Sequence, residues 1–269
     1  MVFLSADGTD DAVQAASDLL WQHWRDGARL MTLPEAIRPT SREAGYAIQA
    51  RLERRTQSPL FGWKIAATSQ AGQRHIAVDG PLAGRLLGEY AHETGARLPF
   101  GRNHMRVAEA EFAFRMAVDL APRAEPYSVD EALNAVATLH PAIEIPDSRF
   151  DDFTIVGAPQ LIADNACAHH FVLGPAAPPQ WRAIDLAGHH VTARVRGGVE
   201  HAGSGANVLG DPREALAWLV NELSRLHVTL RGGQVVTTGT CMIPLPIAPH
   251  DAVDADFGDL GAVAVSFGA

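Results

Sequence analysis

The sequence lacks the features that mark several classes of protein. It contains two cysteines, Cys167 and Cys241, which stand in no paired motif. Neither a disulfide framework nor a cysteine-based zinc site is therefore indicated, and the chain fits a reducing compartment. No run of about 18 apolar residues is present to cross a bilayer, and the amino terminus has no basic region followed by an apolar run. We expect a cytoplasmic protein.

Positive charge is also scarce. The formal net charge is −9, and no basic stretch occurs in the 269 residues. Basic patches hold nucleic-acid phosphates and anionic membrane surfaces, so we expect neither partner. The remaining composition, with 47% hydrophobic and 20% charged residues, is typical of a globular protein with a large core.

Hydrophobic spacing divides the chain into two parts. Residues 1–60 predict a helical arm or cap, with a capping box at Thr40 and Glu43, and residues 61–269 predict a mixed β catalytic body that forms one compact unit with the arm. Because strands and helices do not alternate as in a parallel α/β sheet, we assign the class α+β. The body is expected to hold strands at 61–68, 107–116, 142–147, 234–240 and 260–267, helices at 127–140 and from Asp211-Pro212, and an irregular stretch at 79–104.

The strand at 107–116 carries the most informative pattern. Its apolar residues recur at every second position, so Glu109 and Glu111 point to the same side. Two neighbouring carboxylates repel each other and lose solvation, unless they share a proton, lie on a solvated face near bases such as Arg115, or bind a metal ion. We favour the metal ion, with Glu144 as the third ligand.

Each remaining candidate residue also has an ordinary structural explanation. Lys64 is either an edge-strand charge or a partly buried amine whose pKa burial would lower, which would suit proton transfer. Thr240 follows a glycine at a strand end, where a hydroxyl and backbone amides suit a carboxylate but a simple bulge is equally typical. The others are Ser148, Arg149, Asp164 and Asn165, which would form turns and local ion pairs or face a substrate.

Six motifs then follow one another along residues 15–267. They are Gly62-Trp63-Lys64-Ile65 with Thr68-Ser69, Glu109-Ala110-Glu111-Phe112, Pro141-Ala142-Ile143-Glu144-Ile145 with Asp147-Ser148-Arg149, Ala163-Asp164-Asn165-Ala166, Ala206-Asn207-Val208-Leu209-Gly210-Asp211-Pro212, and Thr238-Gly239-Thr240. In this order they resemble the 2-keto-4-pentenoate hydratase and 2-oxo-3-hexenedioate decarboxylase branch of the fumarylacetoacetate hydrolase superfamily.

The resemblance implies a fold and a set of site residues. The fold would be a mixed β-sandwich or roll of the fumarylacetoacetate hydrolase type, with peripheral helices. Mg²⁺ or Mn²⁺ would be held by Glu109, Glu111 and Glu144, an all-oxygen set that suits hard cations. The implied catalytic residues are Lys64, Asp79 and Asp164, and the implied substrate-binding residues are Ser148, Arg149, Asn165 and Thr240.

One departure from the family pattern concerns the proton relay. Many members carry an acid after the lysine segment, at the position where this chain has Leu82 within Gly80-Pro81-Leu82. Asp79 lies nearby and is the residue we expect to substitute for it. The three glutamates are not affected by this change.

The implied activity is that of a hydro-lyase in aromatic meta-cleavage catabolism. It would hydrate 2-hydroxypenta-2,4-dienoate, the enol of 2-keto-4-pentenoate, to 4-hydroxy-2-oxopentanoate. The alternatives are a 2-oxo-3-hexenedioate decarboxylase, an acylpyruvate-type C–C hydrolase and a catalytically silent partner subunit. A homo-oligomer is also implied, in possible complex with a paralogous hydratase or decarboxylase.

Overall fold

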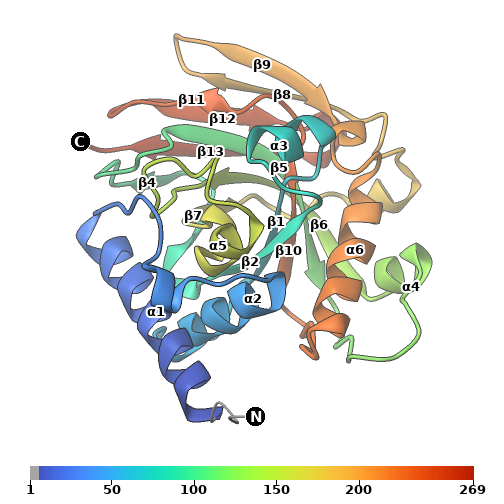
Figure 1. Ribbon diagram of the computed structural model, residues 1–269. Helices are drawn as coiled ribbons and strands as arrows, with labels where there is room; N and C mark the ends of the chain where they lie inside the picture. The colour runs from blue at the N-terminus through green and yellow to red at the C-terminus, as the bar shows by residue number, and fades with distance from the viewer. Residues whose placement is uncertain (1–5) are drawn as a thin grey trace.

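The amino-terminal part of the protein is helical. The computed structural model describes residues 6–269, and its first elements are α1 (Ala6–Asp26) and α2 (Arg42–Ala50) (Figure 1). The predicted capping box at Thr40 is wrong by one residue, because the hydroxyl of Ser41 accepts the hydrogen bond from Ala44 N and caps α2. No helix among residues 6–269 is both long and apolar enough to cross a membrane.

A large mixed sheet forms the centre of the body. Its eight strands include a continuous path of seven, and the eighth, β11 (Leu245–Pro246), pairs with β5. The longest ladder is the antiparallel pair β5–β6, whose strands have ten residues each. In spatial order the path is β2 (Leu82–Leu86), β1 (Gly62–Ala66), β10 (Val235–Thr240), β5 (Val107–Met116), β6 (Val136–Ile145), β7 (His170–Leu173) and β3 (Ala91–Glu93).

A second sheet of five strands packs over the first. Buried and solvent-facing residues alternate along β8 and β13, so one face of this sheet is buried and the other faces solvent. Phe112 of β5 meets Phe257, which follows β12, edge to face at 5.2 Å, in the core between the sheets. The spatial order is β4 (Ala96–Leu98), β13 (Ala262–Phe267), β12 (Ala252–Asp256), β8 (His190–Val195) and β9 (Glu200–Ser204). The expected α+β class with two layers of sheet is confirmed.

Local capping residues determine where the peripheral helices α6 and α4 begin. In α6 (Pro212–Arg225), the Asp211 side chain accepts from Arg213 N and proline occupies the first turn, as the sequence predicted. The capping box of Ser128 and Glu131 opens α4 (Val129–Asn134). Two short helices, α3 (Gln70–His75) and α5 (Ala158–Ala163), complete the set. Figure 1 shows α6 and α4 on one side of the sheets and the amino-terminal helices on another.

Two expectations about the body were wrong. The helix predicted at 127–140 ends at Asn134, and Val136 begins β6, because pairing with β5 over the whole length of the strand outweighs the local helical pattern. The stretch 79–104, expected to be irregular, contains β2, β3 and β4. All five residues of β2 are buried, since it lies beside β1 at one edge of the large sheet.

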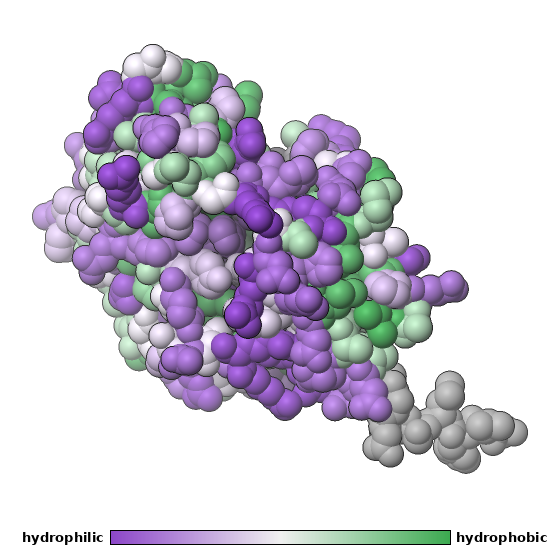
Figure 2. Space-filling model, turned by 90° about the vertical axis from the view of Figure 1, so that its left-hand side faces the viewer, coloured by the Kyte–Doolittle hydropathy of each residue, from purple (hydrophilic) through white to green (hydrophobic). Residues whose placement is uncertain are grey.

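The helical arm is fastened to the body by buried side-chain amides. Gln49 Nε2 donates to the carbonyl oxygens of Ala83 and Ile162, and Gln160 Oε1 accepts from Leu33 N. Each bond joins an arm residue to a body residue across a buried contact. Hydrophilic residues cover much of the face shown in Figure 2, with hydrophobic residues interspersed among them.

Candidate metal centre and active site

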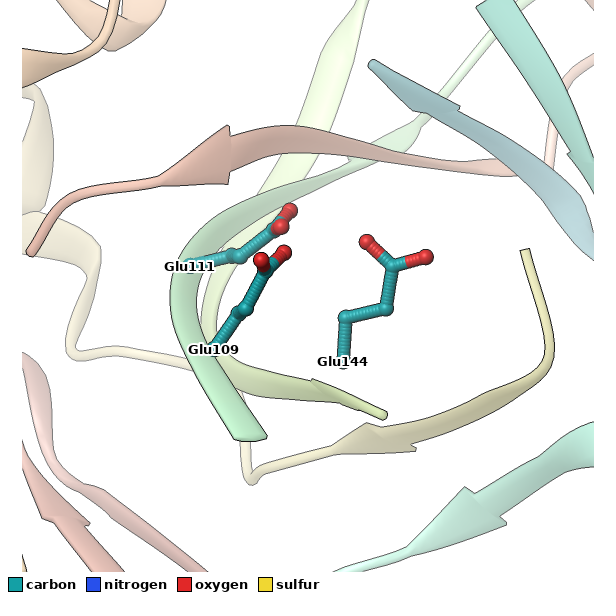
Figure 3. A group of neighbouring side chains, drawn as sticks. All are labelled: Glu109, Glu111 and Glu144. Carbon is teal, nitrogen blue, oxygen red and sulfur yellow. The ribbon is translucent and has the colours of Figure 1, made fainter. Parts of the chain in front are cut away.

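Strand register brings the three glutamates together. Glu109 and Glu144 are directly opposed Cα partners in the β5–β6 ladder, and Glu111 follows two residues along β5 on the same side. Each of the three offers a carboxylate oxygen within 4.8 Å of the other two. Figure 3 shows Glu109 and Glu111 side by side, with the carboxylate of Glu144 facing them.

Several oxygens of this cluster have no hydrogen-bond partner although they are buried. Glu111 and Glu144 are fully buried, and Glu109 is half-buried. One oxygen of Glu111 and both oxygens of Glu144 lack a hydrogen bond, although Glu144 Oε2 lies 3.1 Å from the Lys64 ammonium. Buried carboxylate oxygens without partners are costly, and a bound cation would supply the missing partner.

The pKa values of the cluster describe the same repulsion in the absence of a cation. Burial, reinforced by the neighbouring charge of Glu144, raises the pKa of Glu109 to about 7, although Lys64 opposes the rise. Burial, with Glu144 and Glu109, also holds the pKa of Glu111 well above its ordinary value. Burial raises the pKa of Glu144 too, against the pull of Lys64. Burial and mutual repulsion therefore oppose the ionisation of all three groups, and a bound metal ion would relieve that repulsion.

A divalent cation fits this donor set. Six-coordinate Mg²⁺ binds oxygen at about 2.1 Å, which places its ligands about 3–4 Å from one another, and Ca²⁺ spaces them slightly wider. The mutual limit of 4.8 Å for Glu109, Glu111 and Glu144 is compatible with both ions. Carboxylate oxygens are also the donors that such hard cations prefer.

Glu111 is held in place by β10. Its Oε2 accepts hydrogen bonds from the Thr237 hydroxyl and from Gly239 N, the latter at 2.8 Å. The β10–β5 ladder is interrupted between Thr237 and Thr240, which lets the Gly239 amide point at Glu111. Gly239 has φ +94°, and a Cβ there would lie 2.3 Å from the Thr68 hydroxyl oxygen. Only glycine therefore fits this position.

Lys64 brings a positive charge close to the glutamates. Its Nζ lies 3.1 Å from Glu144 Oε2 and donates a hydrogen bond of 3.1 Å to Ala166 O. Burial pushes the pKa of Lys64 downward, but attraction from Glu144, Glu109 and Glu111 outweighs it, so the net pKa lies above the ordinary value. The lowered pKa expected from burial alone is therefore wrong, and Lys64 is a charged ammonium here.

A cavity of about 650 Å³ opens beside this cluster. Lys64, Glu109 and Thr240 line it, together with many apolar side chains. The Thr240 hydroxyl donates to Met242 O at 2.9 Å, so it must give up that bond before it can donate to a ligand. Among the predicted residues, these three border the cavity, and Glu111 and Glu144 lie beside Glu109.

The structure places a second group of predicted residues in a separate buried network. Asp164 accepts from the Ser148 hydroxyl at 2.7 Å and forms a buried ion pair with Arg149. Arg149 also donates to the carbonyl oxygens of Asp147 and Ala168, and its guanidinium lies over the ring of Trp24 from α1, at 4.2 Å. These contacts join the arm to the body, and none of Ser148, Arg149 and Asp164 lines the cavity.

Asn165 and Asp79 also lie outside the cavity lining. The Asn165 side chain accepts from Arg85 N and donates to Arg85 O, at 2.7 and 2.8 Å, and so pairs with the backbone of β2. The Asp79 side chain is 86% exposed and pairs with Arg42 on the surface. Leu82, where the family acid was expected, is buried in β2. The positions of Asn165 and Asp79 do not support the substrate-binding and catalytic roles predicted for them.

Three residues near the site were given no role there by the sequence analysis. Thr237 holds Glu111, and Asn207 and Cys167 line the cavity. A composition signal was also missed, because Lys64 is the only lysine among the 22 lysines and arginines of the chain. All the other positively charged side chains counted here are arginines, so the one lysine is a stronger candidate for a functional role.

Comparisons with known proteins agree with this geometry. The family model described as fumarylacetoacetate (FAA) hydrolase C-terminal matches residues 89–267. A 2-keto-4-pentenoate hydratase from Burkholderia vietnamiensis is 31% identical over 96% of this chain and 98% of its own length. A 2-oxo-hept-4-ene-1,7-dioate hydratase from Escherichia coli is 30% identical over 84% of this chain and 86% of its own length.

A solved structure shares the fold over almost the whole chain. It is 4-oxalocrotonate decarboxylase from Pseudomonas putida G7, complexed with magnesium and adipate. Its TM-score is 0.87 at 23% identity, and the match covers 96% of this chain and 97% of the decarboxylase. At that identity the likeness establishes the common fold.

Proposed function

Since this chain belongs to the fumarylacetoacetate hydrolase family, we propose that it is a metal-dependent hydro-lyase that hydrates 2-hydroxypenta-2,4-dienoate to 4-hydroxy-2-oxopentanoate. The observation that carries this proposal is the triad of Glu109, Glu111 and Glu144 beside Lys64, at one wall of a cavity, in a chain that matches a hydratase from end to end. The relative from Burkholderia vietnamiensis bears the name of this activity.

The three glutamates would hold the cation, with Mg²⁺ or Mn²⁺ as our proposed ions. The magnesium in the decarboxylase of the same fold agrees with this choice. When bound, the cation would supply Lewis-acid polarisation of the substrate's 2-oxo oxygen. The residues of the chain fix the ligands: β5–β6 register sets Glu109 opposite Glu144, and Thr237 with Gly239 orients Glu111.

Lys64 is the proposed proton carrier. In the first step the enol hydroxyl of the dienoate loses a proton and C5 gains one, which gives a 2-oxo-3-enoate. Water then adds its oxygen to C4 while C3 takes a proton. Lys64 Nζ lines the cavity 3.1 Å from Glu144 Oε2, and it would become a better proton donor when a bound cation shares the charge of the glutamates and lowers the pKa of Lys64.

The test is a spectroscopic assay. The protein with Mg²⁺ and 2-hydroxypenta-2,4-dienoate should bleach the ultraviolet absorbance of the conjugated dienol, and 4-hydroxy-2-oxopentanoate should accumulate. Protein treated with a chelator is the control. Unchanged absorbance and no product would contradict the proposal, whereas CO₂ release from 2-oxo-3-hexenedioate would support the decarboxylase in its place.

The cytoplasmic location and the homo-oligomer stay predictions. A fractionation of native cells checks the location. Sedimentation of the purified protein checks the oligomer, and co-purification with a paralogous hydratase or decarboxylase would identify the proposed complex.

A further inference from the structure

Much of the cavity lining is apolar. Ile76 follows α3, Met105 precedes β5, and Phe153 lies in the segment after β6, and all three are half-buried and line the cavity. Ile243 also lines it, although its side chain is 73% exposed, which places this residue at the cavity rim. Apolar side chains around an opening lose contact with water when a ligand covers them, so they favour an apolar ligand.

The polar side chains in the lining, apart from Lys64 and Glu109, include Thr68, Ser69, His75 and Asn207. Ser69 Oγ accepts from Gly72 N at 3.0 Å, and Asn207 Nδ2 donates to Cys241 O at 2.8 Å. His75 packs edge-on against Phe153, with ring centroids 6.1 Å apart. These groups offer a ligand hydroxyls, an amide and an imidazole, but no guanidinium or ammonium group.

The cavity lining also has little positive charge available to a ligand. No arginine lines the cavity in the part of the chain that the structure describes, and Lys64 is already paired with Glu144. A carboxylate that is enclosed without an opposite charge is disfavoured. The cavity lining therefore disfavours diacids, the substrate type that the name of the Escherichia coli relative indicates for that protein.

The volume points to a substrate longer than five carbons. A cavity of about 650 Å³ lies in the range that encloses ligands of drug size, whereas 2-hydroxypenta-2,4-dienoate has only about eight non-hydrogen atoms. With its carboxylate end at the glutamates, such a small acid would fill only part of this volume and leave part of the apolar lining uncovered.

We propose that the preferred substrate is a 2-hydroxy-2,4-dienoate that carries an uncharged alkyl or aryl tail beyond C5, and that this tail lies against Ile76, Phe153 and Ile243. The inference rests on the proposed function for the identity of the reacting end. It goes beyond that function in naming the tail and in excluding a second carboxylate.

Binding of unreactive 2-oxo acids tests the tail preference without any turnover. Calorimetric titrations with Mg²⁺ present would compare 2-oxopentanoate, 2-oxohexanoate, 2-oxooctanoate and 2-oxoadipate. Each buried methylene is worth roughly a fourfold gain, so 2-oxooctanoate should bind at least about 10-fold tighter than 2-oxopentanoate. We expect 2-oxoadipate to bind at least about 10-fold more weakly than 2-oxohexanoate, its monoacid counterpart. Equal or tighter binding of 2-oxoadipate would overturn the proposal.

Two isoleucine variants locate the effect in the cavity. The Ile243→Arg variant should raise affinity for 2-oxoadipate about 10-fold and lower it for 2-oxooctanoate. The Ile155→Arg variant is the control, because its side chain is 72% exposed, like that of Ile243, but does not line the cavity. Both sites are exposed, so the fold should tolerate the change. Unchanged affinities in Ile243→Arg would refute the placement of the tail.

The two proposals fail in different ways. If the protein hydrates 2-hydroxypenta-2,4-dienoate but binds diacids as well as long monoacids, the tail inference alone is wrong. If long monoacids bind best but none of the corresponding dienoates is hydrated, the proposed reaction is wrong. The preference of the cavity for an uncharged tail would still be supported.

Discussion

Lys64 Nζ lies 3.1 Å from Glu144 Oε2, and Lys64 is the only lysine in the chain. A single buried ammonium thus faces three carboxylates from two adjacent strands. This excess of negative charge links the protonation of Lys64, the binding of a cation and the stability of the fold, and each link can be measured.

The protonation of Lys64 can be observed directly. Protein labelled with [ε-¹⁵N]lysine should give one side-chain signal, which the Lys64→Arg variant lacks. We expect an ammonium without added metal throughout pH 6–10, since the neighbouring carboxylates hold the pKa of Lys64 above its ordinary value. Mg²⁺ should lower that pKa, because the cation shares the same carboxylates. A neutral amine at pH 7 without metal would contradict this assignment.

Removal of one ligand charge should weaken the cation site. We expect Glu109→Gln to lower Mn²⁺ affinity about 100-fold, measured by calorimetry, while the circular dichroism spectrum persists because Glu109 is only half-buried. Glu93→Gln, at an exposed position of β3, is the matched control and should bind Mn²⁺ like the parent protein. Equal affinities in the two variants would exclude Glu109 as a ligand.

Stabilisation by Mg²⁺ should grow with pH. Without metal the folded-state pKa of Glu109 is about 7, above its ordinary value of 4.5, so the folded protein binds more protons than the unfolded chain between these values. Its contribution to stability is present below pH 4.5 and is lost as the pH rises through 7. A bound cation replaces those protons, and at 100 times the Kd it stabilises by about 2.7 kcal/mol.

The measurement is the difference in Tm with and without Mg²⁺ between pH 5 and 8. We expect a small shift at pH 5 and one of roughly 5 °C or more at pH 8. Titrating groups away from the cation contribute to both curves and cancel in the difference, whereas Glu111, Glu144 and Lys64 titrate together with Glu109. A shift that stays constant across this range would show that the carboxylates do not titrate with the binding of metal.

Substitutions at two neighbouring threonines can show whether Thr237 positions Glu111 or only packs in the core. Thr237 and Thr238 are both fully buried, but the hydroxyl of Thr237 donates to Glu111 whereas that of Thr238 donates to Phe112 O. We expect Thr237→Val to lower Mn²⁺ affinity about 10-fold, because it removes a hydrogen bond that orients a ligand. Thr238→Val should lower stability by about 1 kcal/mol and leave Mn²⁺ affinity unchanged. If Thr238→Val lowered Mn²⁺ affinity and Thr237→Val did not, Thr237 would have no role in positioning Glu111.

The sequence predicts the local part of this site but not its long-range part. A strand period of two placed Glu109 and Glu111 on one side without further information. That Glu144 lies opposite Glu109 depends on the register between two strands, and a shift of one residue would have turned its side chain away. The site was therefore found through the order of motifs, and the structure supplied the pairing.

Burial explains the other differences between expectation and structure. Residues 127–140 have a helical pattern, yet pairing with β5 draws Val136–Ile145 into the sheet. The residues alone left a local ion pair or a substrate contact open for Arg149, and the family resemblance implied the substrate contact; its guanidinium lies within the protein against Asp164 and Trp24. Which charges become enclosed depends on residues far apart in the chain, such as α1 in this case, and local patterns do not contain that information.

Asp164 provides the clearest test of structural against catalytic roles. The Asp164→Asn variant leaves the buried guanidinium of Arg149 without its counter-charge, so we expect it to lose about 3–5 kcal/mol of unfolding free energy. Mn²⁺ affinity of the folded fraction should be unchanged, since Asp164 does not line the cavity. If this variant does not fold, Ser148→Ala serves instead: it removes one hydrogen bond to Asp164 and should cost about 1 kcal/mol. Parental stability with hydration lost in Asp164→Asn would restore the catalytic role first predicted from its motif, because a purely structural ion pair cannot be removed without loss of stability.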